Sequence, residues 1–185
     1  EHNIIYVTSD GTGDGSSWGN ATSELQYAAA VASDGETQVW VKTGTYYGDV
    51  TESNGAFNIY QRNRVYGGFE GDETPDFNID NRDLENNPTI LDGENQRRVI
   101  NQQDHFGSSA FSIWDGFTIQ NGSAGSGGGA YICSNSYFYN CSFINNTSNG
   151  QGGAIYSVTP LNDHSKNIIE NCIFENNTSS MGGAI

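Results

Sequence analysis

Short runs of alternating apolar and polar residues recur along the second half of the chain. In the run through Cys141, Phe143 and Asn145, every second residue falls on one face, and this period of two is typical of a β-strand. The strings NCSFINNTS (140–148) and NCIFENNTS (171–179) are near copies, and GFTIQNGSA (116–124) is a divergent third. A period of about 20–50 residues indicates a repeat architecture.

Stacking these repeats brings equivalent residues into three columns. The columns are Phe117, Cys141 and Cys172; Ile119, Phe143 and Phe174; and, at a corner, Asn121, Asn145 and Asn176. Coils of a parallel β-solenoid lie about 4.8 Å apart, so the apolar columns point inward. Each corner Asn side chain is expected to bond the same amide one coil along. The pattern predicts an all-β, three-sided parallel β-helix, with strands near 130–132, 136–139, 141–144, 154–156, 167–169 and 172–175.

A glycine-rich phrase occurs three times. It stands as GGGAYI (127–132), GGAIYS (152–157) and GGAI (182–185), and we align the copies on Ala130, Ala154 and Ala184. Paired glycines suit sharp corners that need a positive φ. Since the third copy stops at Ile185, we expect a fragment of a longer protein. Its open last coil would then self-associate end to end.

The phrases GGA[IL] and FxxN resemble the repeat of chlamydial polymorphic outer-membrane proteins, with FINN at 143–146 and FENN at 174–177. The first half resembles β-helix surface proteins of Bacteroidetes-like bacteria. The matching strings are YVTSDGTGDGSSWGNAT (6–22), VYGGFEGDET (65–74), RDLENNPTILDG (82–93) and WDGFTIQNG (114–122). The resemblance implies a right-handed β-helix, export and an extracellular or outer-membrane surface location. It supplies no catalytic residues.

The first part of the chain differs in kind. Residues 4–8 alternate as a strand, and SELQYAAAVA (23–32) predicts a short helix with Ser23 as its N-cap. Its stripe of Leu25, Ala28, Ala29 and Ala32 would cover the N-terminal end of the core. The string QVWVKTGTYYG (38–48) then predicts the first strand and corner. We therefore divide the chain into a cap with irregular coils, 1–110, and regular repeats, 111–185.

Charge is concentrated in the cap. The net charge is −15, and 18 of the 22 acidic residues lie within 1–110; such a surface repels nucleic acid and anionic membranes. No apolar run approaches a membrane span of about 18 residues. An acidic loop at about 67–88 is expected to close over the coil, with a calcium site as the alternative.

A second calcium candidate precedes the helix. Asp10, Thr12 and Asp14 alternate in SDGTGDGSS (9–17) as in the front half of a calcium loop, but the closing Glu is missing, since that position holds Ala21. A Gly/Asp turn without metal is the favoured interpretation. We expect no cofactor.

Catalysis is disfavoured within this segment. A polysaccharide lyase needs a cation and a base, yet only Lys166 is basic after residue 110, and strand alternation separates Arg97 from Arg98. A hydrolase needs two carboxylates at a fixed separation, and Asp115 stands alone before Asp163. The three histidines, His2, His105 and His164, have no evident partner.

Aromatic and cysteine residues complete the candidates. Aromatic rings backed by Asn and Asp suit carbohydrate, and six tyrosines lie near strands or corners: Tyr46, Tyr47, Tyr131, Tyr137, Tyr139 and Tyr156. Outer-face packing is the alternative. Cys141 and Cys172 are close enough for a disulfide, but buried free thiols are favoured. Cys133 has no assigned role.

These observations lead to one preferred function and two alternatives. We expect an exported, adhesin-like bacterial surface protein that binds glycan or a host or environmental protein, without catalysis here. One alternative is the N-terminal part of a polysaccharide lyase or glycoside hydrolase whose active site lies beyond residue 185. The other is a passive stalk that displays another domain.

Overall fold

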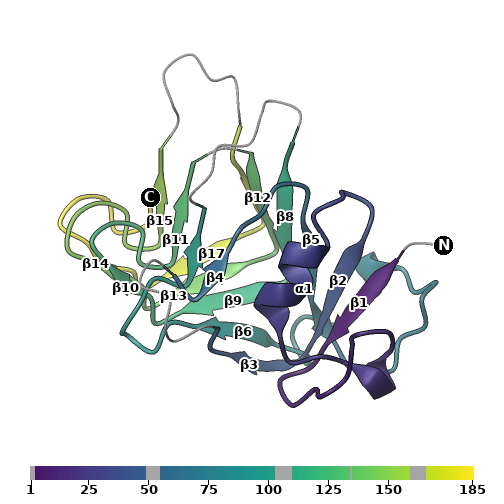
Figure 1. The fold of residues 1–185 in the computed structure, drawn as a ribbon. Helices are drawn as coiled ribbons and strands as arrows, with labels where there is room; N and C mark the ends of the chain where they lie inside the picture. The colour runs from purple at the N-terminus through teal and green to yellow at the C-terminus, as the bar shows by residue number, and fades with distance from the viewer. Residues whose placement is uncertain (1–2, 49–54, 103–109, 134, 159–165) are drawn as a thin grey trace.

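The computed structural model describes residues 3–48, 55–102, 110–133, 135–158 and 166–185. Within them the regular secondary structure is mostly β, with one short α-helix (Figure 1). The elements are β1 (Ile4–Val7), η1 (Trp18–Asn20), α1 (Leu25–Val31), β2 (Gln38–Lys42), β3 (Gly44–Tyr46), β4 (Phe57–Asn58), β5 (Arg64–Phe69), η2 (Ile79–Asn81), β6 (Thr89–Asp92), β7 (Ile100–Asn101), β8 (Ser112–Asp115), β9 (Phe117–Gln120), β10 (Ser123–Ala124), β11 (Ala130–Ile132), β12 (Ser136–Tyr139), β13 (Ser142–Ile144), β14 (Thr147–Ser148), β15 (Ile155–Ser157), β16 (Ile168–Glu170) and β17 (Ile173–Glu175).

The strands form three main parallel sheets, as a three-sided parallel β-helix requires. Their orders are β1-β2-β5-β8-β12-β16, β3-β6-β9-β13-β17 and β4-β7-β11-β15, and β10 pairs with β14 in a small fourth sheet. From β2 onward, successive strands of the chain fall in different sheets, and strands of neighbouring coils pair in parallel; β1 and β2 are neighbours in the same sheet. The predicted fold class is confirmed. Strand β5 pairs with β8, and β6 pairs with β9, so two sheets continue across the division that we placed at residue 110.

The register brings the predicted columns together. Ile119, Phe143 and Phe174 are direct partners, and the rings of Phe143 and Phe174 stack with centroids 5.2 Å apart. Phe117, Cys141 and Cys172 also fall in one column, because each directly precedes a residue that pairs with the neighbouring coil. Phe117, Cys141, Ile119 and Phe143 are buried in the main core.

The corner column differs from the expectation in its side chains. Asn121, Asn145 and Asn176 share the corner with φ of 52°, 56° and 53°, which Asn tolerates better than most residues. Asn145 is exposed, however, and Asn121 Nδ2 donates to Asp92 Oδ2 at 2.9 Å. The expected bonding between these corner amides is wrong. The bonds between coils are made instead by the next residue along, which is the buried Asn146 in one coil and Asn177 in the following coil.

That next residue is the Asn of the FxxN phrase. Asn146 Nδ2 donates to Ile119 O at 2.9 Å, and Asn146 Oδ1 accepts from the Gly122 N–H at 2.9 Å. One coil later, Asn177 Nδ2 donates to Phe143 O at 2.8 Å, and Asn177 Oδ1 accepts from the Asn146 N–H at 3.0 Å. Each FxxN Asn therefore bonds one N–H and one C=O of the preceding coil.

The glycine phrase aligns on its first Gly. Gly127, Gly152 and Gly182 have φ of 62°, 59° and 69°, whereas Ala130 pairs with Ile155. Alignment of Ala130 with Ala154 is thus wrong by one residue, because the left-handed corner sets the register. A Cβ on the following Gly153 would lie 2.5 Å from Gly183 O and 2.6 Å from Thr178 O, so the coils approach there backbone to backbone.

Helix α1 caps one end of the core, as predicted, beside β1 and β2 (Figure 1). Its predicted stripe of Leu25, Ala28, Ala29 and Ala32 is buried in the main core. The buried amide of Asn63 joins the cap to the coil, since its Nδ2 donates to Ala29 O at 2.5 Å and to Ala32 O at 3.2 Å.

The predicted N-cap is wrong. Glu24 occupies that position and makes no side-chain cap hydrogen bond. The Leu25 N–H instead bonds Ser23 O at 3.0 Å, which leaves Ser23 one residue outside the cap.

The acidic loop starts later than predicted, because β5 continues through Phe69. The loop packs apolar side chains on the outer face of β2 and β5, where Phe77 and Ile79 contact an outer aromatic cluster: Tyr6, Trp40, Tyr66 and Phe69, with Trp18. Arg82 anchors it through an ion pair to Asp115 at 3.0 Å. These contacts match the favoured expectation of a loop closed over the coil.

Candidate ligand-binding pocket

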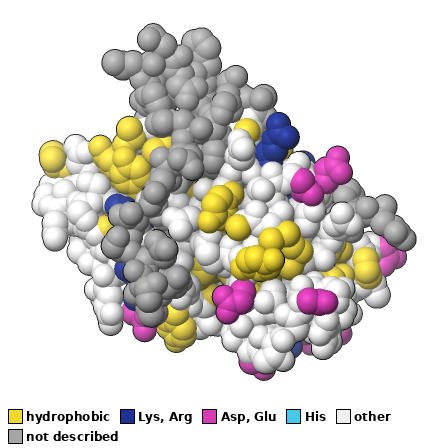
Figure 2. Space-filling view, in the orientation of Figure 1, with side chains coloured by type: hydrophobic (Ala, Val, Ile, Leu, Met, Phe, Trp, Pro, Cys, Tyr) yellow, Lys and Arg dark blue, Asp and Glu magenta, His cyan; other side chains and the backbone are white. Residues whose placement is uncertain are grey.

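A pocket of about 580 Å³ lies between α1 and the first coil. Its lining combines aromatic rings with small polar groups. The lining residues are Ser23, Glu24, Leu25, Gln26, Tyr27, Ala30, Tyr46, Gly48, Phe57 and Tyr60. Figure 2 shows hydrophobic side chains gathered over α1, with acidic side chains beside them. This volume suits a small molecule or a few sugar rings.

The two sides of α1 explain the pocket. One side is buried on the core through Leu25, so the other side presents Gln26 and Tyr27 to the opening. Tyr27 is 68% exposed, unusually open for a large aromatic side chain. Gln26 Oε1 accepts from the Asn58 N–H at 2.6 Å, which ties the helix to β4.

The opposite wall comes from the first coil. Tyr46 ends β3 and Phe57 begins β4, and both are buried. The Tyr46 hydroxyl donates to Lys42 O at 2.9 Å, and burial, with a smaller effect of Asp10, raises the Tyr46 pKa well above its usual value. The hydroxyl therefore stays protonated and bonded, and Tyr46 serves as wall. Tyr60, partly exposed, adds a fourth ring to the lining.

Sequence reasoning found only part of this pocket. Tyr46 was among the predicted aromatics, whereas Tyr27 and Tyr60 were not. Tyr27 lies on α1 outside its buried stripe, and Tyr60 follows the short strand β4. A helical-wheel plot that places Tyr27 opposite Leu25, Ala28 and Ala29 is the signal that could have found it.

The other predicted tyrosines do not line the pocket. Tyr47 is exposed beside the pocket without lining it. Tyr131 and Tyr156 pair on β11 and β15 with ring centroids 5.5 Å apart. Tyr137 and Tyr139 belong to β12, where Tyr137 stacks on Phe111 at 5.6 Å. The four rings on β11, β12 and β15 pack on the outer faces of sheets, in agreement with the alternative interpretation.

The predicted calcium residues form a local turn. Asp14 Oδ1 accepts from the Ser16 N–H at 3.0 Å and from Asn20 Nδ2 at 2.5 Å. The side chain and backbone of Ser16, with a smaller effect of Asn20, lower the Asp14 pKa. Asp10 and Thr12 line a small polar hollow of about 220 Å³, and Asp14 does not. Among the residues that the structure describes, no group of three or more His, Cys, Asp or Glu is placed to hold a metal.

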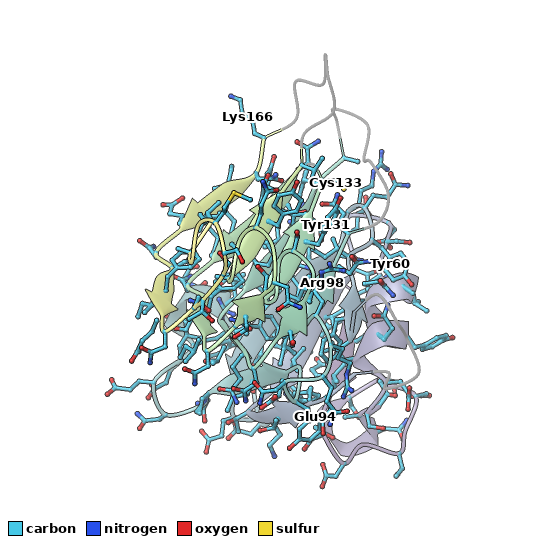
Figure 3. All side chains as sticks on the ribbon, turned by 90° about the vertical axis from the view of Figure 1, so that its left-hand side faces the viewer. Tyr60, Glu94, Arg98, Tyr131, Cys133 and Lys166 are labelled. Carbon is cyan, nitrogen blue, oxygen red and sulfur yellow. The ribbon has the colours of Figure 1, made fainter. Side chains whose placement is uncertain are left out.

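Arg97 and Arg98 both make contacts within the fold. Arg97 forms an ion pair with Glu94. Arg98 Nη2 donates to Ser126 O at 2.8 Å, and its guanidinium lies 5.0 Å from the ring centre of Tyr131 (Figure 3). Burial lowers the Arg98 pKa from its usual value. His2, His105 and His164 lie outside the described residues.

The three cysteines are free thiols. Cys141 is buried and Cys172 half-buried, one coil apart in the same column. Burial raises the Cys141 pKa, and a hydrogen bond from Cys141 lowers that of Cys172 to about 7. Cys133 is buried, and its N–H donates to Gln102 Oε1 at 2.9 Å.

Comparison with protein families matches the end of the chain to a known repeat. The model of the Chlamydia polymorphic membrane protein repeat matches residues 140–158 and 171–185. These segments contain the two FxxN phrases and the last two glycine phrases. Residues 140–185 therefore carry polymorphic-membrane-protein-like repeats.

Such repeats belong to outer-membrane or surface proteins, so the match supports a surface-exposed bacterial protein. Comparison with curated proteins gives no match, and neither does comparison with solved structures. Within the described part of the chain, no helix is long and apolar enough to span a bilayer.

Proposed function

We propose that this chain is a non-catalytic, adhesin-like module of an exported bacterial surface protein, and that it binds carbohydrate in the pocket beside α1. The family match supports the surface location. Four aromatic rings together with Ser23, Glu24 and Gln26 support the choice of ligand. Sugar rings offer C–H faces for stacking and hydroxyls for such polar groups.

The exposed ring of Tyr27 is the observation that carries this proposal. An aromatic side chain left 68% exposed at the mouth of a pocket loses hydrophobic stabilisation unless a ligand covers it. The buried walls of Tyr46 and Phe57 keep the pocket open and fixed. A preformed site of this kind costs little conformational entropy on binding.

The proposal predicts that Tyr27→Ala and Tyr60→Ala weaken glycan binding. Each ring contact is worth about 0.5–1.5 kcal/mol, which corresponds to roughly a twofold to tenfold rise in Kd. A glycan array followed by titration calorimetry measures this. Tyr47→Ala is the matched control, because Tyr47 is exposed nearby but outside the lining.

The outcomes separate the three functions. Product release from pectin, alginate or glycosaminoglycan by this chain would overturn the non-catalytic assignment. Absence of any glycan or protein ligand would favour a stalk. If the protein binds a glycan tightly and neither Tyr27→Ala nor Tyr60→Ala changes the affinity, the pocket beside α1 is not the binding site.

A further inference from the structure

We propose that the pocket beside α1 selects uncharged carbohydrate over acidic sugars, and that Glu24 is the residue that sets this selectivity. The inference rests on the proposed function and deepens it by naming the ligand class. Its basis is the charge of the lining and the free state of one carboxylate.

Glu24 is the one charged side chain among the described residues that line the pocket. It is exposed, and it occupies the N-cap of α1 without making a side-chain cap bond. Its backbone is held, since its N–H donates to Thr22 Oγ1 at 3.1 Å. The position is therefore fixed while the carboxylate is left available to a ligand.

A carboxylate is an acceptor only. Hydroxyls of a neutral sugar can donate to Glu24, whereas the ionised carboxylate of a uronic acid cannot and is repelled. One like charge at a few Å in aqueous surroundings weakens binding by about fivefold. No Lys or Arg in the described lining offsets this repulsion.

The surroundings add to the effect. The pocket belongs to the part of the chain that holds 18 of the 22 acidic residues. Asp10 already acts on the Tyr46 wall, where its charge contributes to the raised pKa of that phenol. Of the basic residues in this part of the chain, Arg82, Arg97 and Arg98 form structural contacts elsewhere, and Lys42, Arg62 and Arg64 are not among the lining residues. The charge in the described lining is therefore negative, which disfavours anionic ligands.

The test compares tetrasaccharides in matched pairs by calorimetry. The pairs are galactose with galacturonate, mannose with mannuronate and glucose with glucuronate oligomers. We expect a neutral member to bind, with its acidic partner about fivefold or more weaker at low salt and the gap narrowing as salt rises. Glu24→Gln should reduce the gap to less than about twofold, because an amide carries no charge.

Glu36→Gln is the control, since Glu36 is exposed but does not line the pocket; it should leave the gap unchanged. Equal binding of neutral and acidic partners, or a gap that survives Glu24→Gln, contradicts the selectivity alone. Absence of binding to all six oligomers contradicts the proposed function itself. A circular dichroism spectrum shows whether each variant keeps the fold.

Discussion

Asn146 shows at the scale of one residue why the FxxN phrase recurs. Its amide is fully buried and bonds backbone groups of the preceding coil at Ile119 and Gly122. Asn146→Ala would remove both bonds and leave the buried Gly122 N–H without its partner, at about 1–3 kcal/mol. We expect a loss of about 1–3 kcal/mol in the free energy of unfolding, measured by urea denaturation.

The neighbouring Asn145 provides the control for this prediction. It is exposed, with φ of 56°, and glycine adopts that conformation without strain. Asn145→Gly should therefore change stability by less than about 1 kcal/mol. If both variants lose the same free energy of unfolding, the buried Asn146 amide does not stabilise the fold more than the exposed Asn145 does.

Cys172 gives a second prediction at this scale. Its pKa is lowered to about 7, first by the hydrogen bond from Cys141, whereas burial raises the pKa of Cys141. Because the thiolate is the nucleophile, iodoacetamide should modify Cys172 with a midpoint near pH 7 and spare Cys141 in the folded protein. Mass spectrometry of the alkylated peptides reports both rates.

Cys141→Ala tests the cause, since it removes the hydrogen bond that lowers the Cys172 pKa. The alkylation midpoint should then rise toward the ordinary thiol value of about 8.5. A wild-type midpoint already at that value, or equal modification of both cysteines, would contradict the assignment.

The sequence pattern predicted which residues stack from coil to coil better than it predicted what each side chain contacts. The period-2 runs place Phe143 and Phe174 correctly, because burial of one sheet face fixes the register. They do not show which Asn after the corner turns inward, since that depends on the left-handed corner itself. In the same way, helical periodicity places Tyr27 on the outer side of α1 but does not show the pocket, because its far wall, at Phe57, comes from another element.

At the scale of elements, the acidic loop is held to the β-helix by Arg82. Its side chain is 4% exposed, pairs with Asp115, and donates to Gly67 O at 2.7 Å and to Ile79 O at 2.6 Å. Arg82→Met should cost about 3–5 kcal/mol, because it leaves a partly buried carboxylate without its partner. Thermal unfolding and limited proteolysis between residues 70 and 88 measure the release.

The double variant Arg82→Met, Asp115→Asn separates charge from packing. Removing both charges should restore part of the lost stability, since no ion is then left unpaired. If the single and double variants unfold alike and the loop stays resistant to protease, the ion pair is not what holds the loop.

The two ends of the β-helix core differ in how well they are covered. Helix α1 covers one end of the core, and the N- and C-termini lie on opposite sides of the molecule (Figure 1). On β17, Ile173 is 60% exposed and the adjacent Phe174 only partly buried. An exposed strand edge favours pairing with another chain. End-to-end self-association through β17 is therefore still our prediction.

Sedimentation velocity over a range of concentrations tests this association. Ile173→Lys places a charge on the strand edge and should shift the protein toward monomer. The control is Val31→Lys, since Val31 is exposed on α1 at the other end of the core. A monomer at all concentrations, or equal effects of the two variants, would contradict pairing through β17.

At the scale of the whole molecule, our central proposal is that the parallel β-helix carries a carbohydrate-binding pocket beside α1. The most direct measurement is a crystal structure with the tightest-binding neutral tetrasaccharide. The account predicts sugar rings against Tyr27 and Tyr60, with a hydroxyl donating to Glu24. A sugar bound instead along the outer sheet faces near Tyr131 or Tyr137, with the pocket beside α1 empty, would contradict it.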